Sequence, residues 1–225
     1  MACSGRHERA ARARGFSAIC GLDEVGRGAL FGPVYAAAVI LDPDRAVRGL
    51  KDSKELDADR REVLAERIRE RAVAWSVGGA DAFEIDRINI LQASRLAMKR
   101  AVEMLPRRPD YLLLDAVTID VSVPQEAVIH GDALCQCIAA ASILAKTARD
   151  ECMRKWDQVF PDFGLCRNKG YGTDEHYAAL RKFGPTMLHR YSFEPVRLTC
   201  QLDLWAGYDQ GMVPGARVNA TASAG

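Results

Sequence analysis

The sequence predicts an α/β fold in which a mixed central sheet is flanked by helices and followed by a small helical C-terminal extension. Short apolar runs alternate along the chain with segments whose apolar residues recur at helical spacing. The run from Tyr111 to Asp115 is apolar up to its final carboxylate, as is typical of a central strand covered on both faces. The chain has no internal repeat and no apolar stretch of about 18 residues, so we expect a globular protein without a membrane span.

The individual elements follow from the same patterns. Strands are predicted at residues 16–22, 34–41, 75–79, 111–115 and 127–130. Helices are predicted at residues 57–73, 82–105 and 134–156, with a further helix of about three turns after Thr173. Asp57 and Thr173 are candidate N-cap residues, and Pro106 ends the second helix. The first half of the helix over 134–156 is small and apolar on nearly every side, so we expect it to be buried.

These elements divide the chain into four parts. We expect a disordered basic arm at 1–15, an α/β core at 16–155, a helical extension at 156–197 and a mostly disordered tail at 198–225. The arm carries arginines but no apolar segment, so it is not a signal peptide. A transit peptide is the less favoured alternative.

The composition excludes several classes of protein. The net charge of +1 gives no bulk attraction to nucleic acid, so phosphate binding requires a local basic patch. The seven cysteines form no C-x-x-C pair and show no zinc-finger spacing. An odd number of thiols without a secretory signal indicates reduced cysteines and a cytoplasmic protein. A monomer is the default expectation.

Four carboxylates are candidates for a site. Asp23 and Glu24 follow a predicted strand and precede a glycine-rich turn, and adjacent carboxylates repel each other unless a cation holds them. Taken alone, the pair could equally be a solvated turn. Asp115 ends an apolar strand, and strand ends are where sites in α/β proteins often form. Asp132 precedes the buried helix and is either a fourth site carboxylate or that helix's N-cap.

The ligand chemistry of this set indicates a metal site. Carboxylate oxygens without histidine-rich or thiol partners suit hard divalent cations such as Mg²⁺ or Mn²⁺. Two such ions could clamp the attacking and leaving oxygens of a phosphodiester. We therefore expect a divalent-metal site, with two ions during catalysis.

Two glycine-containing segments are candidates for phosphate or sugar contact. In Gly26-Arg27-Gly28, glycines let backbone N–H groups approach a ligand closely. A dinucleotide-binding turn is the alternative, but the spacing does not fit G-x-G-x-x-G and the acidic pair would repel a pyrophosphate. The second segment, residues 167–173, places the cation of Lys169 and the ring of Tyr171 beside a helix N-terminus, which suits phosphate contact and stacking. Its alternative is an ordinary basic loop with the ring packed inward.

Taken together and in this order, these segments resemble ribonuclease HII, the bacterial type 2 ribonuclease H. The resemblance covers about residues 17–197. The matching blocks are Gly21–Gly28 with Gly32–Val34, Leu50–Lys54, Leu113–Ala116, Gly131–Ala133, Ile138–Lys146 with Arg149 and Asp150, Lys169–Thr173 with His176, and Gly184–Pro185 with His189, Arg190, Ser192 and Phe193. Any one block is moderately specific, but their collinear order leaves little room for coincidence.

The resemblance implies a ribonuclease H-like fold and a divalent-metal endoribonuclease. Its reaction would hydrolyse the phosphodiester 5′ to a ribonucleotide, in an RNA–DNA hybrid or embedded in duplex DNA, and leave 3′-hydroxyl and 5′-phosphate ends. This activity would serve ribonucleotide removal in DNA repair and primer clearance in DNA replication. A non-catalytic nucleic-acid-binding module of the same fold is the alternative, and the retention of four carboxylates argues against it.

The resemblance also implies roles for individual residues. The metal-binding catalytic carboxylates would be Asp23, Glu24, Asp115 and Asp132. The residues that read the ribose 2′-hydroxyl, the group that separates RNA from DNA, would be Gly26, Arg27 and Gly28. Tyr171 would pack on the neighbouring sugar. The phosphate-facing residues would be Ser142 and Lys146, together with Lys169 of the basic loop.

One departure from the family pattern is His130, which stands where the family usually has a lysine before Gly-Asp. A lysine keeps its charge at any working pH, whereas an exposed histidine loses it near neutrality. We therefore expect the pH or metal dependence to differ from that of relatives.

A second signal lies beyond the matching region. The segment Gln201-Leu202-Asp203-Leu204-Trp205 resembles the short peptide with which bacterial replication and repair proteins bind the sliding clamp. A flexible tail could present the two leucines and the tryptophan to an apolar pocket, with Gln201 fixing the register. The alternative is a last amphipathic turn that packs on the domain.

Overall fold

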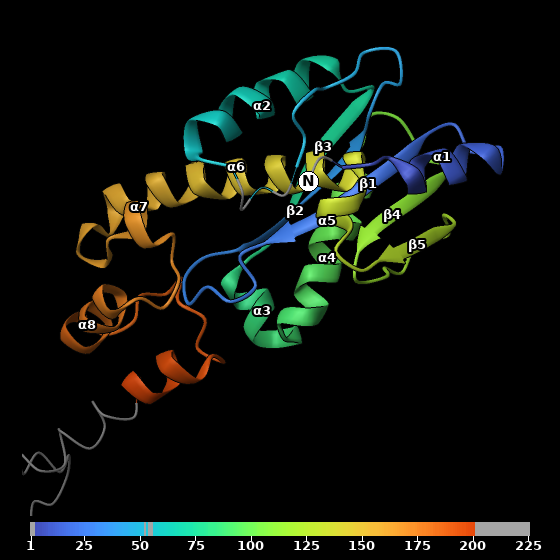
Figure 1. Ribbon diagram of the computed structural model, residues 1–225. Coiled ribbons are helices and arrows are strands. Elements are labelled where there is room, and N and C mark those ends of the chain that lie inside the picture. Colours follow the sequence, from blue (N-terminus) through green and yellow to red (C-terminus); the bar gives the residue numbers. More distant parts are fainter. Residues whose placement is uncertain (1–2, 52, 54–55, 201–225) are drawn as a thin grey trace, which may run out of the picture.

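The central element of the protein is a five-stranded mixed sheet (Figure 1). The computed structural model describes residues 3–51, 53 and 56–200. The strands are β1 (Ile19–Val25), β2 (Val34–Ile40), β3 (Ala74–Ala80), β4 (Tyr111–Asp115) and β5 (Gln125–Val128). Their spatial order is β3-β2-β1-β4-β5, with antiparallel pairing from β3 to β1 and parallel pairing from β1 to β5. The mixed sheet expected from the sequence is confirmed.

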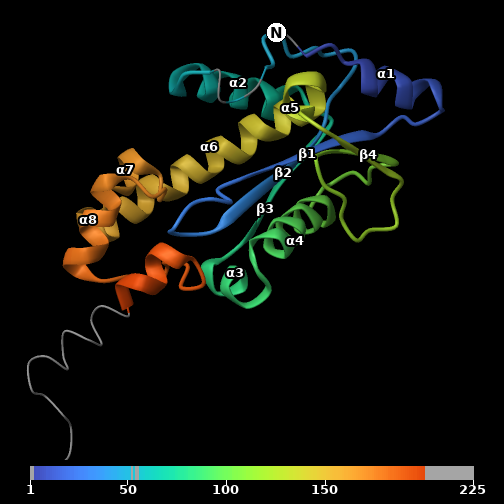
Figure 2. The same ribbon diagram turned by 60° about the horizontal axis from the view of Figure 1, so that its bottom comes forward.

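Helices cover both faces of this sheet. On one face lie α2 (Ala58–Arg71) and α6 (Gln136–Val159), and on the other lie α3 (Ala82–Ile88) and α4 (Ile90–Glu103) (Figures 1 and 2). The remaining helical elements are α1 (Arg6–Ala13), α5 (Gly131–Leu134), a 3-10 turn at Pro161–Phe163, α7 (Leu165–Asn168), α8 (Asp174–Phe183) and a helical segment at residues 194–200. Within the described ranges, no helix is long and apolar enough to cross a membrane.

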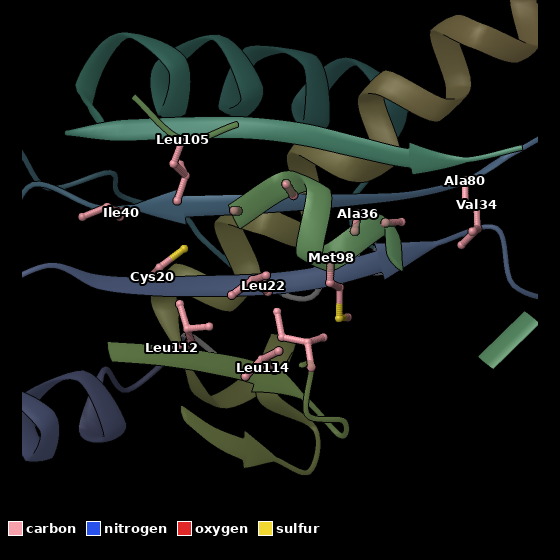
Figure 3. Close-up of a cluster of buried hydrophobic side chains, with 14 of the residues drawn as sticks. Cys20, Leu22, Val34, Ala36, Ile40, Ala80, Met98, Leu105, Leu112 and Leu114 are labelled. Carbon is pink, nitrogen blue, oxygen red and sulfur yellow. The ribbon is translucent and has the colours of Figure 1, made fainter. Parts of the chain in front are cut away.

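The alternation of side chains along β1 and β4 decides which residues face which helix layer. Cys20, Leu22, Leu112 and Leu114 are fully buried and pack with Met98 of α4 (Figure 3). Successive residues of a strand point to opposite faces. The residues at the alternate positions of both strands therefore face α6. Asp23 of β1 and Asp115 of β4 are among these residues.

Helix α6 packs directly against the backbone of β1. A Cβ added to Gly21 would overlap the backbone of Cys137 and Ile138, so only glycine permits this approach. The alanines at 139–141 and 145 are fully buried, as the small apolar pattern predicted. The close approach brings the next turns of α6, with Ser142, over the end of β1.

Several element boundaries differ from the predicted ones, including that of β5, which lies at Gln125–Val128 instead of 127–130. Three further differences concern α4, α6 and β1. The helix expected over 82–105 is two helices, because Asn89 adopts a left-handed φ of 66° and its side chain caps α4. The helix expected from 134 begins at Gln136, because Cys135 is extended and separates it from α5. Strand β1 continues to Val25, so the acidic pair lies within the strand rather than after it.

The N-terminal arm is also ordered where the basic composition suggested disorder. Residues Arg6–Ala13 form α1, and Ala11 is buried beside Ile19 and Tyr111. Arg14 donates a hydrogen bond to the Tyr111 hydroxyl at 2.9 Å. Apolar packing and long-range hydrogen bonds thus stabilise a segment whose local sequence gives little indication of structure. Of the expected tail, residues 198–200 are helical and 201–225 lie outside the described residues.

Candidate active site

A cavity of about 370 Å³ lies at the edge of the sheet where the parallel strands β1 and β4 end. It brings together residues that are far apart in the sequence and that come from β1, β4, α2, α5, α6 and the loops before α2 and α8. The lining residues are Asp23, Glu24, Val25, Ser53, Arg61, Asp115, Asp132, Ser142, Lys146 and Tyr171. All four predicted carboxylates therefore share one cavity with three of the predicted substrate-binding side chains.

Asp23 and Glu24 reach the same cavity although they are neighbours on one strand. The parallel pairing of β1 with β4 ends at Leu22 and Leu114, and β1 continues beyond it. The Asp23 side chain lies on the face of the sheet that α6 covers, and it is 6% exposed. Glu24 lies on the opposite face. Because β4 ends beside it, its carboxylate can still enter the cavity around the strand end. Its Oε1 accepts a hydrogen bond from Arg27 Nη1 at 3.2 Å.

A backbone contact joins the end of β4 to the short helix that carries the fourth carboxylate. The Gly131 N–H donates to Asp115 Oδ1 at 2.8 Å. His130 is the residue at the N-terminal boundary of α5, with a left-handed φ of 57°, and Asp132 is buried in the first turn. The interpretation of Asp132 as an N-cap is therefore wrong, because α6 begins beyond Cys135. The position of Asp132 in the cavity fits a site carboxylate.

Three of the carboxylates, those of Asp23, Glu24 and Asp115, interact electrostatically. Burial raises the pKa of Asp23 well above its usual range, and the charges of Glu24 and Asp115 raise it further. Burial also raises the pKa of Glu24, although Arg27 opposes this shift. Among the residues that the structure describes, no three acidic, histidine or cysteine side chains form a preformed metal-binding group. The donor set is nevertheless all carboxylate, and a divalent cation would relieve its mutual repulsion.

A basic and hydroxyl-bearing wall faces these carboxylates. Lys146 Nζ lies 2.6 Å from Asp150 Oδ1, and burial lowers the pKa of Lys146. Arg61 Nη2 lies 3.7 Å from the same carboxylate, and its Nη1 donates to the Ser53 carbonyl at 3.2 Å. The hydroxyls of Ser53 and Ser142 are 2.8 Å apart. Lysine, arginine and two hydroxyls on one wall suit contact with phosphate oxygens.

Sequence reasoning missed Ser53 and Arg61. Ser53 belongs to the matching block at 50–54, which was available as a signal but received no role. Arg61 lies on α2, where several arginines follow one another, and no local pattern distinguishes the one that faces the cavity.

The glycine-rich turn rests on a buried arginine. Arg149 of α6 is fully buried and donates to the carbonyl of Lys169 at 2.7 Å and to that of Phe31 at 3.4 Å. Gly26 has a φ of 93°, and a Cβ there would lie 2.7 Å from Cδ of Arg149. The Arg149 guanidinium also lies 5.1 Å from the centre of the Tyr171 ring. One side chain therefore positions both the turn and the tyrosine.

A second buried arginine holds the other side of the turn. Arg190 is fully buried, and it donates to the Arg27 carbonyl at 2.8 Å and to the Gly32 carbonyl at 3.0 Å. The Arg27 side chain and Gly28 are exposed, so both can meet a ligand. Sequence reasoning gave Arg149 and Arg190 no role, because arginine in a sequence is ordinarily a surface residue.

Within the described part of the chain, five of the predicted residues do not line the cavity. Gly26, Arg27 and Gly28 lie in the turn beside it, and the other two are Lys169 and His130. Lys169 has a left-handed φ of 53°, and its Nζ donates to the Cys166 carbonyl at 2.6 Å. His130 is exposed at the boundary of α5 and does not line the cavity. The predicted clamp-binding segment at 201–205 lies outside the described residues.

A buried histidine pair supports the loop that carries Tyr171. His176 Nδ1 donates to the Tyr171 carbonyl at 2.9 Å, and His189 Nδ1 accepts from the Thr186 N–H at 2.9 Å. These two contacts fix the tautomers, so His189 Nε2 donates to His176 Nε2 at 3.1 Å. Both rings are fully buried, and each is neutral in this arrangement.

This pair should make stability fall in mild acid. Burial and the neighbouring His176 lower the pKa of His189 to about 3. The unfolded chain binds this proton below about pH 6.5, so stability declines as the pH falls from there toward the folded value. Between pH 6.5 and 5 the loss is about 2 kcal/mol.

His189→Gln isolates this contribution. A glutamine amide can donate to His176 and accept from Thr186 without titrating, so the variant should lose stability less steeply between pH 7.5 and 5 in urea unfolding. Parallel pH dependences for wild type and variant would refute the assignment.

Known proteins share both the sequence pattern and the fold. The chain matches the family model described as Ribonuclease HII over residues 20–196. It is 64% identical over 195 residues to the Ribonuclease HII of Solibacter usitatus, covering 87% of this chain and 86% of that protein. The structure of the ribonuclease H2 from Pyrococcus horikoshii is similar, with a TM-score of 0.69, 25% identity and coverage of 82% of this chain and 97% of that one. The ribonuclease HII in a complex with PCNA from Archaeoglobus fulgidus has a TM-score of 0.68, 25% identity and coverage of 80% and 96%. The chain therefore belongs to the ribonuclease HII family and is an endoribonuclease H hydrolase.

Proposed function

We propose that this enzyme is divalent-metal-dependent and hydrolyses the phosphodiester 5′ to a ribonucleotide, leaving 3′-hydroxyl and 5′-phosphate ends. Its substrates are RNA–DNA hybrids and duplex DNA with embedded ribonucleotides. The observation that carries the proposal is the cavity in which Asp23, Glu24, Asp115 and Asp132 face Lys146 and the other phosphate-binding candidates.

The four carboxylates would hold Mg²⁺ or Mn²⁺, with two ions during catalysis. When bound, such ions stabilise the charge that develops on a phosphoryl group and activate water as a nucleophile. The position of Asp23 on β1 directs its side chain toward α6. A hydrogen bond from the Gly131 N–H fixes the Asp115 carboxylate. Arg61 and Lys146 offer positive charge to the phosphate on the opposite wall. Ser53 and Ser142 offer hydroxyl groups to its remaining oxygens.

Selection of a ribose follows from the rigid turn beside this cavity. The Arg27 carbonyl is occupied by Arg190, which fixes the plane of the peptide that ends at Gly28. The exposed backbone of Gly28 can then meet the 2′-hydroxyl, which is both donor and acceptor. The Tyr171 ring is backed by Arg149, so it offers a fixed surface to the sugar of the adjoining nucleotide.

A nicking assay tests the proposal. The protein is incubated with Mg²⁺ or Mn²⁺ and a DNA duplex that carries one ribonucleotide, beside an all-DNA duplex. We expect a single nick 5′ to the ribonucleotide, no nick in the control duplex and no activity after chelation. Binding of the duplex without any nick would favour the alternative, a non-catalytic nucleic-acid-binding module of the same fold.

The exposed histidine before Gly131 should influence the conditions of the reaction. A lysine at position 130 would keep a positive charge near Asp132 at all working pH values, whereas a histidine does not. His130→Lys should therefore broaden the pH–rate profile toward high pH or change the metal concentration needed for half-maximal rate. An unchanged profile and an unchanged metal dependence would remove this idea.

We also propose that residues 201–205 bind a sliding clamp, with Gln201, Leu202, Leu204 and Trp205 as contacts, in ribonucleotide removal and primer clearance. The Archaeoglobus fulgidus relative forms a complex with PCNA, which supports the proposal. Immobilised clamp should retain the wild-type protein, and Leu204→Ala with Trp205→Ala should abolish retention while nicking of a short duplex continues. Retention of the double variant would argue against this segment as the contact.

A further inference from the structure

The N-terminal segment, residues 3–14, lies outside the region that matches the family model, yet it contacts the elements that carry the fourth carboxylate. We propose that Glu8 and Cys3 are positioning residues for Asp132: they fix the first turn of α6 and the backbone of α5, and thereby the place of the Asp132 carboxylate in the cavity. The inference rests on the proposed metal-dependent function of that cavity.

Helix α6 begins without a cap from its own sequence. Its N-cap residue, Cys135, makes no side-chain hydrogen bond to the first turn. Glu8, which is 129 residues away in the sequence, supplies the contact, because its Oε1 accepts from the Cys137 N–H at 3.0 Å. A carboxylate at a helix N-terminus is also stabilised by the helix dipole. The second Glu8 oxygen, Oε2, is buried and has no hydrogen-bond partner among the described residues, so this carboxylate depends on the contact with α6.

The residues before α1 hold α5 in the same way. The Cys3 thiol donates to the Asp132 carbonyl at 3.4 Å, and the Ser4 hydroxyl donates to the Leu134 carbonyl at 3.5 Å. Gln136 returns a hydrogen bond to the Cys3 carbonyl at 3.4 Å. Helix α5 has four residues and no side-chain cap, so it has little stability of its own. Two of its carbonyl groups, those of Asp132 and Leu134, are satisfied by the N-terminal segment, which therefore restricts how Asp132 can move.

Helix α1 is itself anchored on the sheet. His7 Nδ1 lies 3.0 Å from Glu126 Oε1 on β5, and the Tyr111 hydroxyl donates to the other oxygen of Glu126 at 3.1 Å. In Figure 2, α1 and the segment before it lie beside α5, at the end of α6 that is nearer the sheet edge formed by β4 and β5. The contacts to α5 and α6 are therefore made from a fixed support.

The thiols around Glu8 are poor nucleophiles, which favours a structural use of Cys3. Burial, followed by the Glu8 carboxylate, raises the pKa of Cys3 to about 11 and that of Cys137 well above its usual value. A protonated thiol can donate a hydrogen bond, as the Cys3 thiol does to the Asp132 carbonyl.

Metal binding without substrate tests the inference. Mn²⁺ is titrated into the full-length protein by calorimetry, for wild type, Glu8→Ala, Glu8→Gln and the charge control Glu103→Ala on the opposite face of the sheet. Glu8→Ala should weaken Mn²⁺ binding by roughly tenfold, as is typical when a residue that orients a ligand is lost. Glu8→Gln keeps a carbonyl acceptor for the Cys137 N–H and should restore binding. Glu103→Ala should bind Mn²⁺ like the wild type.

A double-variant cycle separates positioning from a general structural role. In an Asp132→Asn background, Glu8→Ala should cause little further loss of Mn²⁺ affinity, because its effect passes through Asp132. An undiminished loss in that background, or wild-type affinity in Glu8→Ala, would overturn the inference. If Glu8→Ala does not fold, Cys3→Ala and Cys3→Ser make the same comparison, and only the serine, which keeps a donor, should bind Mn²⁺ normally.

These outcomes are distinct from those of the nicking assay. A wild type that binds Mn²⁺ but does not nick would refute the proposed reaction and leave the affinity comparison intact. A wild type that binds no Mn²⁺ would overturn both.

Discussion

Asp23→Asn is expected to abolish nicking at a ribonucleotide and, at the same time, to stabilise the metal-free protein. The carboxylate is 6% exposed and lies in a cavity with three others. Loss of a metal ligand removes several kcal/mol of transition-state stabilisation, so the nicking rate should fall by about 10³-fold or more. The amide keeps the size of the side chain, so the loss of rate would not come from a packing defect.

The stability effect follows from the sign of the pKa shift. Burial, Glu24 and Asp115 raise the pKa of Asp23 in the folded protein above that of the unfolded chain. The stability that the neutral carboxyl contributes is present below the unfolded pKa and is lost as the pH rises through the folded pKa. Asparagine does not ionise, so the metal-free variant should melt at a higher temperature than the metal-free wild type at neutral pH and above.

Thermal melts with and without Mg²⁺ measure both effects. Added Mg²⁺ should raise the melting temperature of the wild type, because a ligand that binds only the folded state stabilises it, and should raise that of Asp23→Asn much less. Asp110→Asn is a control for which the expected change in melting temperature has the opposite sign. Although burial raises its pKa, hydrogen bonds from Ala18 and Ser17 leave the pKa of Asp110 lowered. This variant should therefore melt at a lower temperature, and a destabilised metal-free Asp23→Asn would contradict the electrostatic account.

The carboxylate cluster could be anticipated from the sequence because each member stands beside a strong local signal. Asp115 closes an apolar strand, and strand parity then places it on the α6 side with Asp23. Helix α8 could be predicted equally well from the sequence, because Thr173 accepts a hydrogen bond from the His176 N–H as the expected N-cap. Local patterns of this kind predicted the sheet, most helices and the part of the site that lies at strand ends.

The features that escaped prediction depend on long-range contacts or on single backbone torsions. Apolar periodicity runs across Asn89, so only its left-handed φ of 66° reveals the break between α3 and α4. The docking of α1 requires Glu8 to meet Cys137 across the fold. Arg149 is a buried donor to carbonyls, a use of arginine that a linear pattern cannot distinguish from a surface charge.

Strain also concentrates where function was expected. Among the described residues, the non-glycine residues with a left-handed φ are Asn89, Ala116, His130 and Lys169. Three of them adjoin candidate site residues: Ala116 follows Asp115, His130 precedes the turn to Asp132, and Lys169 stands two residues before Tyr171. Conformations of this kind persist when surrounding contacts over-determine them. Here the Gly131 N–H on Asp115 and the Arg149 guanidinium on the Lys169 carbonyl are such contacts.

Gly26→Ala is expected to reduce both stability and nicking, whereas Gly28→Ala should reduce nicking alone. At position 26 the φ of 93° is costly for alanine, and the new methyl group would lie 2.7 Å from Cδ of the buried Arg149. Together these effects should destabilise the fold by about 3 kcal/mol. At position 28 nothing lies within 4 Å of an added Cβ, so the change in stability should stay within about 0.5 kcal/mol.

The two variants carry the same chemical change and differ in the backbone torsion at the substituted residue and in what surrounds the added methyl group. Urea unfolding gives the stabilities, and kcat/KM for nicking gives the activities. A methyl group on the exposed Gly28 obstructs the approach of the backbone to the ribose, and one on Gly26 meets Arg149 and shifts the turn. Both variants should therefore nick more slowly than wild type. Equal stabilities for the two variants would refute the account of Gly26, and undiminished nicking by Gly28→Ala would remove the proposed contact of the turn with the ribose.

Arg149→Ala separates the torsional cost of a side chain at Gly26 from its steric cost. Alone, it should be strongly destabilising, because it leaves the carbonyls of Phe31 and Lys169 without a donor. In that background the methyl group of Gly26→Ala no longer meets the Arg149 guanidinium, so mainly the torsional cost of about 1–2 kcal/mol should remain. The two substitutions should therefore be less than additive in stability. Strict additivity would mean that the left-handed torsion, and not the close approach of Arg149, is what requires glycine at the turn beside the carboxylates.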